Sequence, residues 1–189
     1  MNGFGPVVPA HSVRWFAAGE HCDDASAGDL LLVDHGTIPD LLIGFGERVA
    51  GLFDRTLKPF AWCRHTAFVR PNGVVSEMGF KGHELRFLDE YAARLYAVVH
   101  FDAATPEQIL ASLAADDSLH GTEYGWASYP PLVLDCLTGA RFGAAWGSTM
   151  ICSTHVTMVA MPLGLFPDRQ PGGTMPVHVA HWLGASPPA

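Results

Sequence analysis

The hydrophobic positions fall into short runs bounded by glycine, proline and aspartate, a pattern typical of strands in a compact domain. Residues 28–36, "GDLLLVDHG", are predicted to be a buried strand, and residues 96–102, "YAVVHFD", are predicted to be a strand. Two alternating runs in residues 63–80, "CRHTAFVRPNGVVSEMGF", flank the triplet Pro-Asn-Gly at 71–73. This triplet suits a three-residue hairpin loop, a type I turn with Gly73 in the left-handed conformation, so we predict a β-hairpin here.

Other segments have the spacing of helices. Residues 40–53 place apolar side chains at helical intervals after an aspartate that suits the N-cap, and residues 85–95 are also predicted to be helical. Thr105 is followed by proline at the first helical position and by Gln108 at the third. This is a capping box, so a helix is predicted to run from there to about Ala115.

The two ends of the chain are rich in residues that interrupt regular structure. Residues 1–27 are predicted to be an irregular extension, and residues 163–189 a Pro- and Gly-rich extension with an edge strand at residues 176–183, "PVHVAHWL". Residues 28–162 are predicted to form the folded domain. Of the 189 residues, 49% are hydrophobic and 16% are charged, which is the composition of one compact globular domain.

Charge and cysteine content exclude several functional classes. The formal net charge of −8 and the absence of a Lys/Arg cluster argue against a nucleic-acid-binding protein. No apolar run is long enough for a transmembrane segment, and the first residues lack the features of a secretory signal. The four cysteines have no CxxC spacing and are expected to be reduced thiols: Cys22, Cys63, Cys136 and Cys152.

Cys152 follows a Gly-Ser-Thr turn and begins a short apolar segment that stops at Pro162. If Ser148 or Thr149 caps this helix, Cys152 lies in the first turn, where unpaired backbone N–H groups and the helix dipole stabilise a thiolate. The same N–H groups bind an oxyanion during acyl transfer. Cys152 is therefore either a nucleophile or, as lone cysteines commonly are, a small buried side chain.

A cysteine nucleophile needs a base and a group that orients the base. His65 begins a predicted core strand. In the register set by the Pro-Asn-Gly loop, Ala67 pairs with Glu77, which puts Glu77 on the same face as His65 and diagonal to it. A two-residue loop would put Glu77 on the other face. A carboxylate beside the imidazole is the orienting group that a Cys-His pair requires, although a solvated glutamate on a half-exposed strand is the alternative.

Metal binding is the main rival chemistry. Zinc ligands could be drawn from His21-Cys22, from Cys63 and His65, or from Cys152 and His155, but none of these spacings matches a known zinc motif. No metal and no cofactor are therefore expected, and phosphate-loop and dinucleotide fingerprints are absent.

These residues, in this order, resemble the circularly permuted branch of the NlpC-type papain-like cysteine peptidases and amidases, in which the histidine precedes the cysteine. "HTAFV" at 65–69 resembles the histidine strand of that family, and "VVSEMG" at 74–79 resembles the next strand with its glutamate. "GTEYGW" at 121–126 resembles a segment near the substrate, and "MICSTHV" at 150–156 resembles the cysteine helix. The resemblance covers residues 28–162.

The resemblance implies an α+β papain-like fold, with a central antiparallel sheet and the Cys152 helix packed against it. It also implies that Cys152 is the nucleophile, His65 the base and Glu77 the orienting group. Tyr124 would position the substrate or the oxyanion, although the nearby aromatic residues Trp126 and Tyr129 make simple packing an equal explanation. The long segment between the first strand and His65, roughly residues 37–60, is not explained by the resemblance.

The expected activity is hydrolysis of an amide bond in a peptide or acyl-amide substrate, and the family makes peptidoglycan stem peptides the leading class. The alternatives are an amidase or acyl hydrolase acting on a lipid or small acyl group, and a non-catalytic papain-like module. Such a module would serve in a larger assembly, where a partner would hold the termini. Without a signal sequence, the expected location is the cytoplasm, or delivery by a phage particle or secretion system as a virion-associated cell-wall hydrolase.

Overall fold

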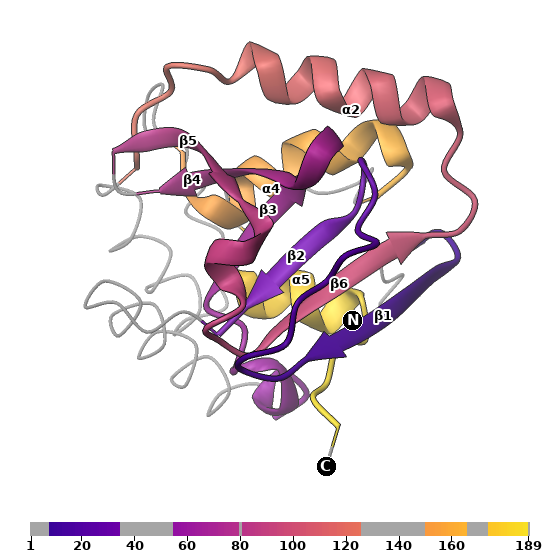
Figure 1. The fold of residues 1–189 in the computed structure, drawn as a ribbon, viewed down its shortest axis with the longest axis vertical. Coiled ribbons are helices and arrows are strands. Elements are labelled where there is room, and N and C mark those ends of the chain that lie inside the picture. Colours follow the sequence, from indigo (N-terminus) through magenta and orange to yellow (C-terminus); the bar gives the residue numbers. More distant parts are fainter. Residues whose placement is uncertain (1–7, 35–54, 80, 126–149, 166–173, 189) are drawn as a thin grey trace.

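The strands form one antiparallel sheet. A computed structural model describes residues 8–34, 55–79, 81–125, 150–165 and 174–188. Within this part of the chain the sheet has six strands in the order β1-β6-β2-β3-β4-β5, and each neighbouring pair is antiparallel (Figure 1). The strands are β1 (His11–Phe16), β2 (Leu30–Val33), β3 (His65–Val69), β4 (Val74–Gly79), β5 (Gly82–Phe87) and β6 (Tyr96–Phe101).

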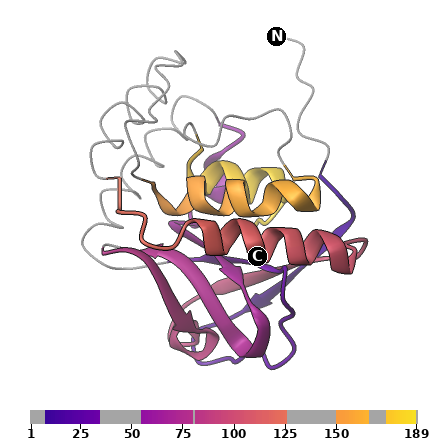
Figure 2. The same ribbon diagram turned by 90° about the horizontal axis from the view of Figure 1, so that it is seen from above.

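The α-helices of the described residues lie together on one side of the sheet (Figure 2). Helix α4 contacts β3 and β4, while α2 and α5 both contact α4. No helix of the described ranges has the combination of length and apolar character that a bilayer crossing requires. The α-helices are α2 (Pro106–Ser118), α4 (Cys152–Ala160) and α5 (Pro176–Trp182), and the short 3-10 helices are η1 (Lys58–Phe60), η2 (Pro71–Gly73), η3 (Leu88–Tyr91) and η5 (Met161–Leu163).

Alternation along the strands divides the core into two clusters, one on each face of the sheet. On β2, Leu30 and Leu32 belong to the cluster under the helices, whereas Leu31 and Val33 belong to the cluster on the opposite face. All four side chains are fully buried. A continuous apolar run is the pattern expected of a strand that is covered on both faces. The strand predicted within residues 28–36 is confirmed as Leu30–Val33, while residues 35 and 36 lie outside the described residues.

The β3–β4 hairpin has the predicted register. Ala67 pairs with Glu77, and the backbone N–H of Arg70 donates to the carbonyl oxygen of Val74 at 2.7 Å. The loop itself differs from a type I turn, because Asn72 (φ 62°) is left-handed as well as Gly73 (φ 68°). Asparagine tolerates this conformation better than most residues, so the loop length and the register are kept.

The N-terminal segment is not irregular throughout, as the sequence had indicated, because it contains β1. This strand pairs with β6 along its whole length and forms one edge of the sheet. Val13 and Trp15, at alternating positions, pack against the cluster under the helices. The alternation was present in the sequence, but the neighbouring histidine, serine and arginine concealed it, since an edge strand carries polar side chains that a central strand does not.

The expected edge strand at residues 176–183 is also wrong, because this segment forms helix α5. Pro176 occupies the first turn, where its missing N–H is not needed. Val179, Ala180 and Leu183 have helical spacing and pack in the cluster under the helices. β-Branched valines favour strands only weakly, and burial of this face against the sheet outweighs that preference.

Residues 85–95 do not form the predicted helix. Their first three residues complete β5, which pairs with β4, and the next four form η3. The pairing depends on a partner strand that lies close in sequence, and local helical spacing does not reveal it. The helix predicted from Thr105 is confirmed, with the capping box of Thr105 and Gln108 in place, although it extends to Ser118. The helix predicted over residues 40–53 lies outside the described residues.

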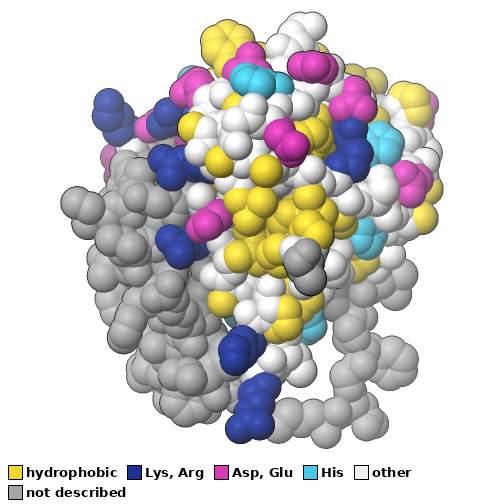
Figure 3. All heavy atoms as spheres, turned by 60° about the horizontal axis from the view of Figure 1, so that its bottom comes forward, with side chains coloured by type: hydrophobic (Ala, Val, Ile, Leu, Met, Phe, Trp, Pro, Cys, Tyr) yellow, Lys and Arg dark blue, Asp and Glu magenta, His cyan; other side chains and the backbone are white. Residues whose placement is uncertain are grey.

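One face of the molecule shows a central group of hydrophobic side chains (Figure 3). Lys and Arg side chains lie around it with Asp and Glu side chains among them, so this face presents no uninterrupted basic surface of the kind that binds a nucleic-acid backbone. Among the described residues, the exposed large hydrophobic side chains are Leu85, Phe87, Leu110 and Met161.

Candidate active site

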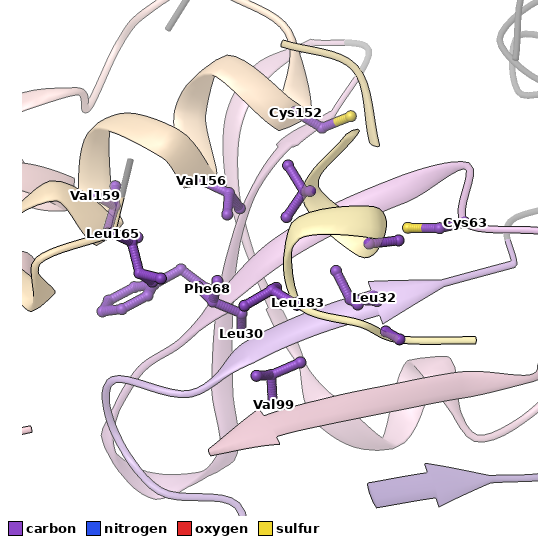
Figure 4. Packing of buried hydrophobic residues seen from close by; sticks show 14 of the residues in the cluster. Leu30, Leu32, Cys63, Phe68, Val99, Cys152, Val156, Val159, Leu165 and Leu183 are labelled. Carbon is purple, nitrogen blue, oxygen red and sulfur yellow. The ribbon is translucent and has the colours of Figure 1, made fainter. Parts of the chain in front are cut away.

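Cys152 is the first residue of helix α4. The N-cap is Ile151, which has no polar side chain, so the predicted capping by Ser148 or Thr149 is not the arrangement at this helix start. The placement of Cys152 in the first turn is nevertheless as predicted. Figure 4 shows Cys152 at the start of α4, with Val156 and Val159 following along the helix. Cys152 is 1% exposed, so its thiol is covered in this conformation.

The start of α4 is fixed by the residue that follows Cys152. The Ser153 hydroxyl donates to the carbonyl oxygen of Thr174 at 2.5 Å, which attaches the first turn to the segment before α5. The Thr157 hydroxyl donates to the Ser153 carbonyl oxygen at 2.7 Å. These bonds are buried, so the backbone N–H groups of the first turn are held in a defined position relative to the sheet.

His65 and Glu77 form a direct, buried pair. Nε2 of His65 lies 2.5 Å from Oε2 of Glu77, and the two side chains are 9% and 4% exposed. The predicted alternation and register thus bring these two residues together, and Glu77 is not a solvated strand residue. Since Nε2 binds the carboxylate, Nδ1 is the ring nitrogen that can exchange a proton with a thiol.

Two further residues hold the Glu77 carboxylate. Nε of Arg86 on β5 donates to Oε1 at 2.5 Å, and the hydroxyl of Tyr91 in η3 donates to Oε2. Both were missed in the sequence because residues 85–95 were predicted to be helical, which gives no pairing of β5 with β4. With three donors on two oxygens, the carboxylate has one fixed orientation in which it accepts the imidazole N–H.

The charges in this group are strongly coupled. Burial alone would raise the pKa of Glu77, but the charge and hydrogen bond of His65, with the donors Tyr91 and Arg86, hold it well below its usual value. Burial and the Glu77 charge raise the pKa of Tyr91, which therefore remains a hydrogen-bond donor. Glu77 is thus a carboxylate and Tyr91 a neutral phenol over the whole physiological pH range.

Cys152 acts on the same imidazole. Burial lowers the pKa of His65, but the charges of Glu77 and Cys152 and the hydrogen bonds to both raise it well above its usual value. His65 therefore interacts with a carboxylate through one side of the ring and with the thiol as well. An imidazolium beside a thiolate is the resting arrangement of a Cys-His nucleophile.

His65 interacts with Glu77, which binds Tyr91, and with Cys152, and these two partners of the group belong to different hydrophobic clusters. Tyr91 belongs to the cluster opposite the helices, whereas Cys152 belongs to the cluster under them. The β3–β4 pairing includes Ala67 and Glu77 but does not extend back to His65, the first residue of β3. Helix α4 contacts both β3 and β4.

Tyr124 lies close to the start of α4, although the two are distant in sequence. It forms an isolated parallel bridge with Met150, two residues before Cys152, and it packs against the cluster that contains Ile151. The glycine at position 82 allows this loop to approach, because a Cβ there would lie 2.3 Å from the backbone oxygen of Thr122. The structure thus places the Tyr124 ring beside the start of the helix, while the role of its hydroxyl stays a prediction. Trp126, Tyr129 and Cys136 lie outside the described residues.

A second buried polar cluster lies on the helix side of the sheet. Oδ1 of Asp116 on α2 lies 2.7 Å from Nε2 of His155 on α4, 3.2 Å from Nε2 of His83 on β5 and 2.7 Å from the Ser76 hydroxyl on β4. Its Oδ2 accepts from Arg70. Burial lowers the pKa of His155 despite the opposing effect of Asp116, so its ring is neutral.

None of the zinc ligand sets drawn from the sequence is formed as such. In the described ranges, the one group of three or more side chains whose ligand atoms all lie within 4.8 Å of one another is His83, Asp116 and His155. His155 belongs to it, but Cys152 does not. Comparison with models of known protein families gives no match, and no curated protein matches the chain.

Proposed function

We propose that the chain is a cysteine-dependent amide hydrolase of papain-like fold, with Cys152 as nucleophile, His65 as base and Glu77 as orienting group. The observation that carries this proposal is the buried His65–Glu77 pair, with Nε2 and Oε2 at 2.5 Å, on the same imidazole that interacts with the Cys152 thiol. A nucleophile, a base and an orienter connected in this order make up a catalytic triad.

The geometry supports a two-step reaction. Sγ of Cys152 attacks the amide carbonyl carbon, and the resulting oxyanion accepts hydrogen bonds from backbone N–H groups in the first turn of α4. His65 gives a proton to the leaving amine, which leaves a thioester on Cys152. Water then attacks the thioester while His65 takes a proton from it, and the acid leaves with the Cys152 thiolate restored.

The substrate class is proposed from the resemblance to NlpC-type enzymes, which makes peptidoglycan stem peptides the first choice. An acyl amide or a lipid-linked acyl group is the alternative substrate for the same chemistry. In both cases the bond that breaks joins a carbonyl carbon to a leaving group that His65 can protonate. The roles of the three residues are therefore unchanged.

A non-catalytic binding module is the second candidate, and it is favoured by one observation. Cys152 is 1% exposed and His65 is 7% exposed, so a substrate carbonyl reaches the sulfur only if neighbouring side chains move. In a module that only binds a partner, the Cys152–His65–Glu77 group would serve as a buried structural network.

The experiment is mass spectrometry of acid-quenched protein during incubation with purified muropeptides and, separately, with N-acyl amides. A thioester adduct on Cys152 together with release of the amine supports the hydrolase. Cys152→Ala should abolish both signals, whereas the matched control Cys63→Ala should keep them, because Cys63 is a buried thiol of the same core cluster. Release of amine by Cys152→Ala at the parent rate would exclude the proposed nucleophile. A parent protein that forms no adduct and whose Cys152 also resists alkylation would be the binding module.

A further inference from the structure

The cluster around Asp116 has the composition of a metal site. Three elements that are distant in sequence bring together Nε2 of His83, Oδ1 of Asp116 and Nε2 of His155, and these ligand atoms all lie within 4.8 Å of one another. Two imidazoles and one carboxylate form a common ligand set for divalent transition metals. We propose that His83, Asp116 and His155 bind one divalent metal ion of the zinc type, which fastens α2 and α4 to the β4–β5 hairpin.

The distances fit a small ion. Zinc bonds to nitrogen and oxygen are about 2.0–2.1 Å long, so neighbouring ligand atoms of a tetrahedral site lie about 3.3 Å apart. Oδ1 of Asp116 is 2.7 Å from Nε2 of His155 and 3.2 Å from Nε2 of His83. An expansion of a few tenths of an ångström therefore converts these hydrogen-bonded contacts into ligand contacts.

A fourth polar atom, a hydroxyl oxygen, lies close to these three. The Ser76 hydroxyl is 2.8 Å from Nε2 of His83 and 2.7 Å from Oδ1 of Asp116. It completes a set of four polar atoms, one each from β4, β5, α2 and α4. A hydroxyl at this place either binds the ion directly or donates to the ligating carboxylate, and structural zinc sites are usually four-coordinate.

The charge of the surroundings favours a cation. Arg70 donates to Oδ2 of Asp116 and, at 2.8 Å, to Oδ1 of Asp117. Apart from the imidazoles, one guanidinium and two carboxylates give a net charge of −1 around the cluster. Arg70 also fixes the second oxygen of Asp116, which leaves Oδ1 aimed at the two imidazoles, as outer residues of metal sites do.

Within the part of the chain that the structure describes, both imidazoles of the cluster form hydrogen bonds through Nε2. Nδ1 of His83 and Nδ1 of His155 are buried and have no hydrogen-bond partner among the described residues. Both rings direct Nε2 at Oδ1 of Asp116. The exposed His120 lies next to the cluster, with its ring centroid 5.6 Å from that of His83.

This site is independent of the proposed hydrolase. Cys152 is not one of its ligands, and the proposed reaction uses no metal. The connection is through position, since His155 lies one turn after Cys152 on α4, so an ion at His155 would fix the helix on which the thiol lies. The inference therefore holds or fails whether or not Cys152 is a nucleophile.

The test is calorimetric titration of the metal-stripped, full-length protein with Zn²⁺, followed by the absorption spectrum of the Co²⁺ form. We expect one ion per chain, a higher unfolding temperature with Zn²⁺, and a four- or five-coordinate Co²⁺ spectrum without thiolate charge-transfer bands. No stoichiometric binding, or an intense thiolate band, would overturn the proposal. Because this readout uses the unaltered chain, it does not depend on the folding of any variant.

Variants then locate the ion. His83→Gln and Asp116→Asn should remove stoichiometric binding, and Arg70→Gln should weaken it by about 10- to 100-fold as an outer residue. Cys152→Ala should bind Zn²⁺ like the parent, and so should His100→Gln, a matched control because Nδ1 of His100 bonds a single carboxylate, Asp29, at 2.8 Å. Loss of binding in Cys152→Ala, or unchanged binding in both His83→Gln and Asp116→Asn, would contradict the assignment.

Discussion

Nε2 of His65 lies 2.5 Å from Oε2 of Glu77, on a neighbouring strand twelve residues along the chain. The β3–β4 hairpin loop sets this relationship, since its three residues put both side chains on one face. The same carboxylate binds Arg86 and Tyr91, and the same imidazole interacts with Cys152. The hairpin register therefore determines whether the Cys152 thiol has an oriented base.

Glu77→Gln keeps the size of the side chain and removes its charge. We expect a folded variant whose amide hydrolysis and Cys152 alkylation are both slower by about 10-fold or more, because the imidazolium loses its counter-charge. The matched control is Glu84→Gln: Glu84 pairs with Glu77 across β4–β5 and bonds Arg86 at 2.8 Å without being part of the His65 pair. Equal rates in Glu77→Gln and the parent would make Glu77 a structural residue only.

Tyr91→Phe removes one donor to Glu77 while the ring still packs in the core. Loss of a buried hydrogen bond to a charged acceptor should lower the free energy of unfolding by about 1.5–3 kcal/mol, as measured by urea denaturation. The control Tyr96→Phe loses a bond from its hydroxyl to the backbone oxygen of Glu20, at 3.2 Å, and should lose less stability. If both variants lose the same stability, the charge of the acceptor is not what makes the Tyr91 bond strong.

The His65–Glu77 pair should make stability depend on pH. Folding lowers the pKa of Glu77. Its contribution to the free energy of unfolding is therefore present above about pH 4.3 and is lost as the pH falls through the folded-state pKa. The pKa of His65 is raised, so its contribution is complete below about pH 6.5 and is lost as the pH rises through the folded-state pKa. The difference in unfolding temperature between the parent and Glu77→Gln should therefore be largest between about pH 4.5 and 6.5. A difference that does not vary with pH would contradict the assigned charges.

Tyr124→Phe should leave the fold intact, because the ring still packs beside the start of α4. If its hydroxyl helps to hold the oxyanion, the rate of amide hydrolysis should fall by about 10²-fold, as for the loss of one such donor. Steady-state kinetics with the substrate identified by mass spectrometry measures this effect. An unchanged rate would limit Tyr124 to packing.

The sequence predicted the centre of the fold better than its ends. Strands β2, β3, β4 and β6 and the capped helix α2 follow from local signals: apolar runs, a hairpin loop and a capping box. Helix α5 and strand β1 are stabilised by burial against residues that are distant in sequence. Leu183, which follows α5, and Val13 of β1 both pack in the cluster under the helices. Local propensity carries no information about such partners, so these two segments were predicted incorrectly.

The sequence predicted part of the candidate site and missed the rest. Cys152, His65 and Glu77 follow from a helix start, a strand start and a register, and the structure brings the three into one connected group. Arg86 and Tyr91 were hidden by the incorrect helix at residues 85–95, and the Asp116 cluster was hidden because its members lie on four different elements. Convergence of this kind results from tertiary packing and leaves no spacing in the sequence.

The most direct test of the central account is the alkylation of the folded protein by limiting iodoacetamide at several pH values, with peptide mapping of all four cysteines. Iodoacetamide reacts with the thiolate form of cysteine, and the imidazole of His65 interacts with the Cys152 thiol. We predict that Cys152 is alkylated first at about pH 6, at least about 10-fold faster than Cys22 or Cys63, and that His65→Gln removes this advantage. Preferential labelling of Cys22, Cys63 or Cys136, with Cys152 unmodified until the protein unfolds, would contradict the account.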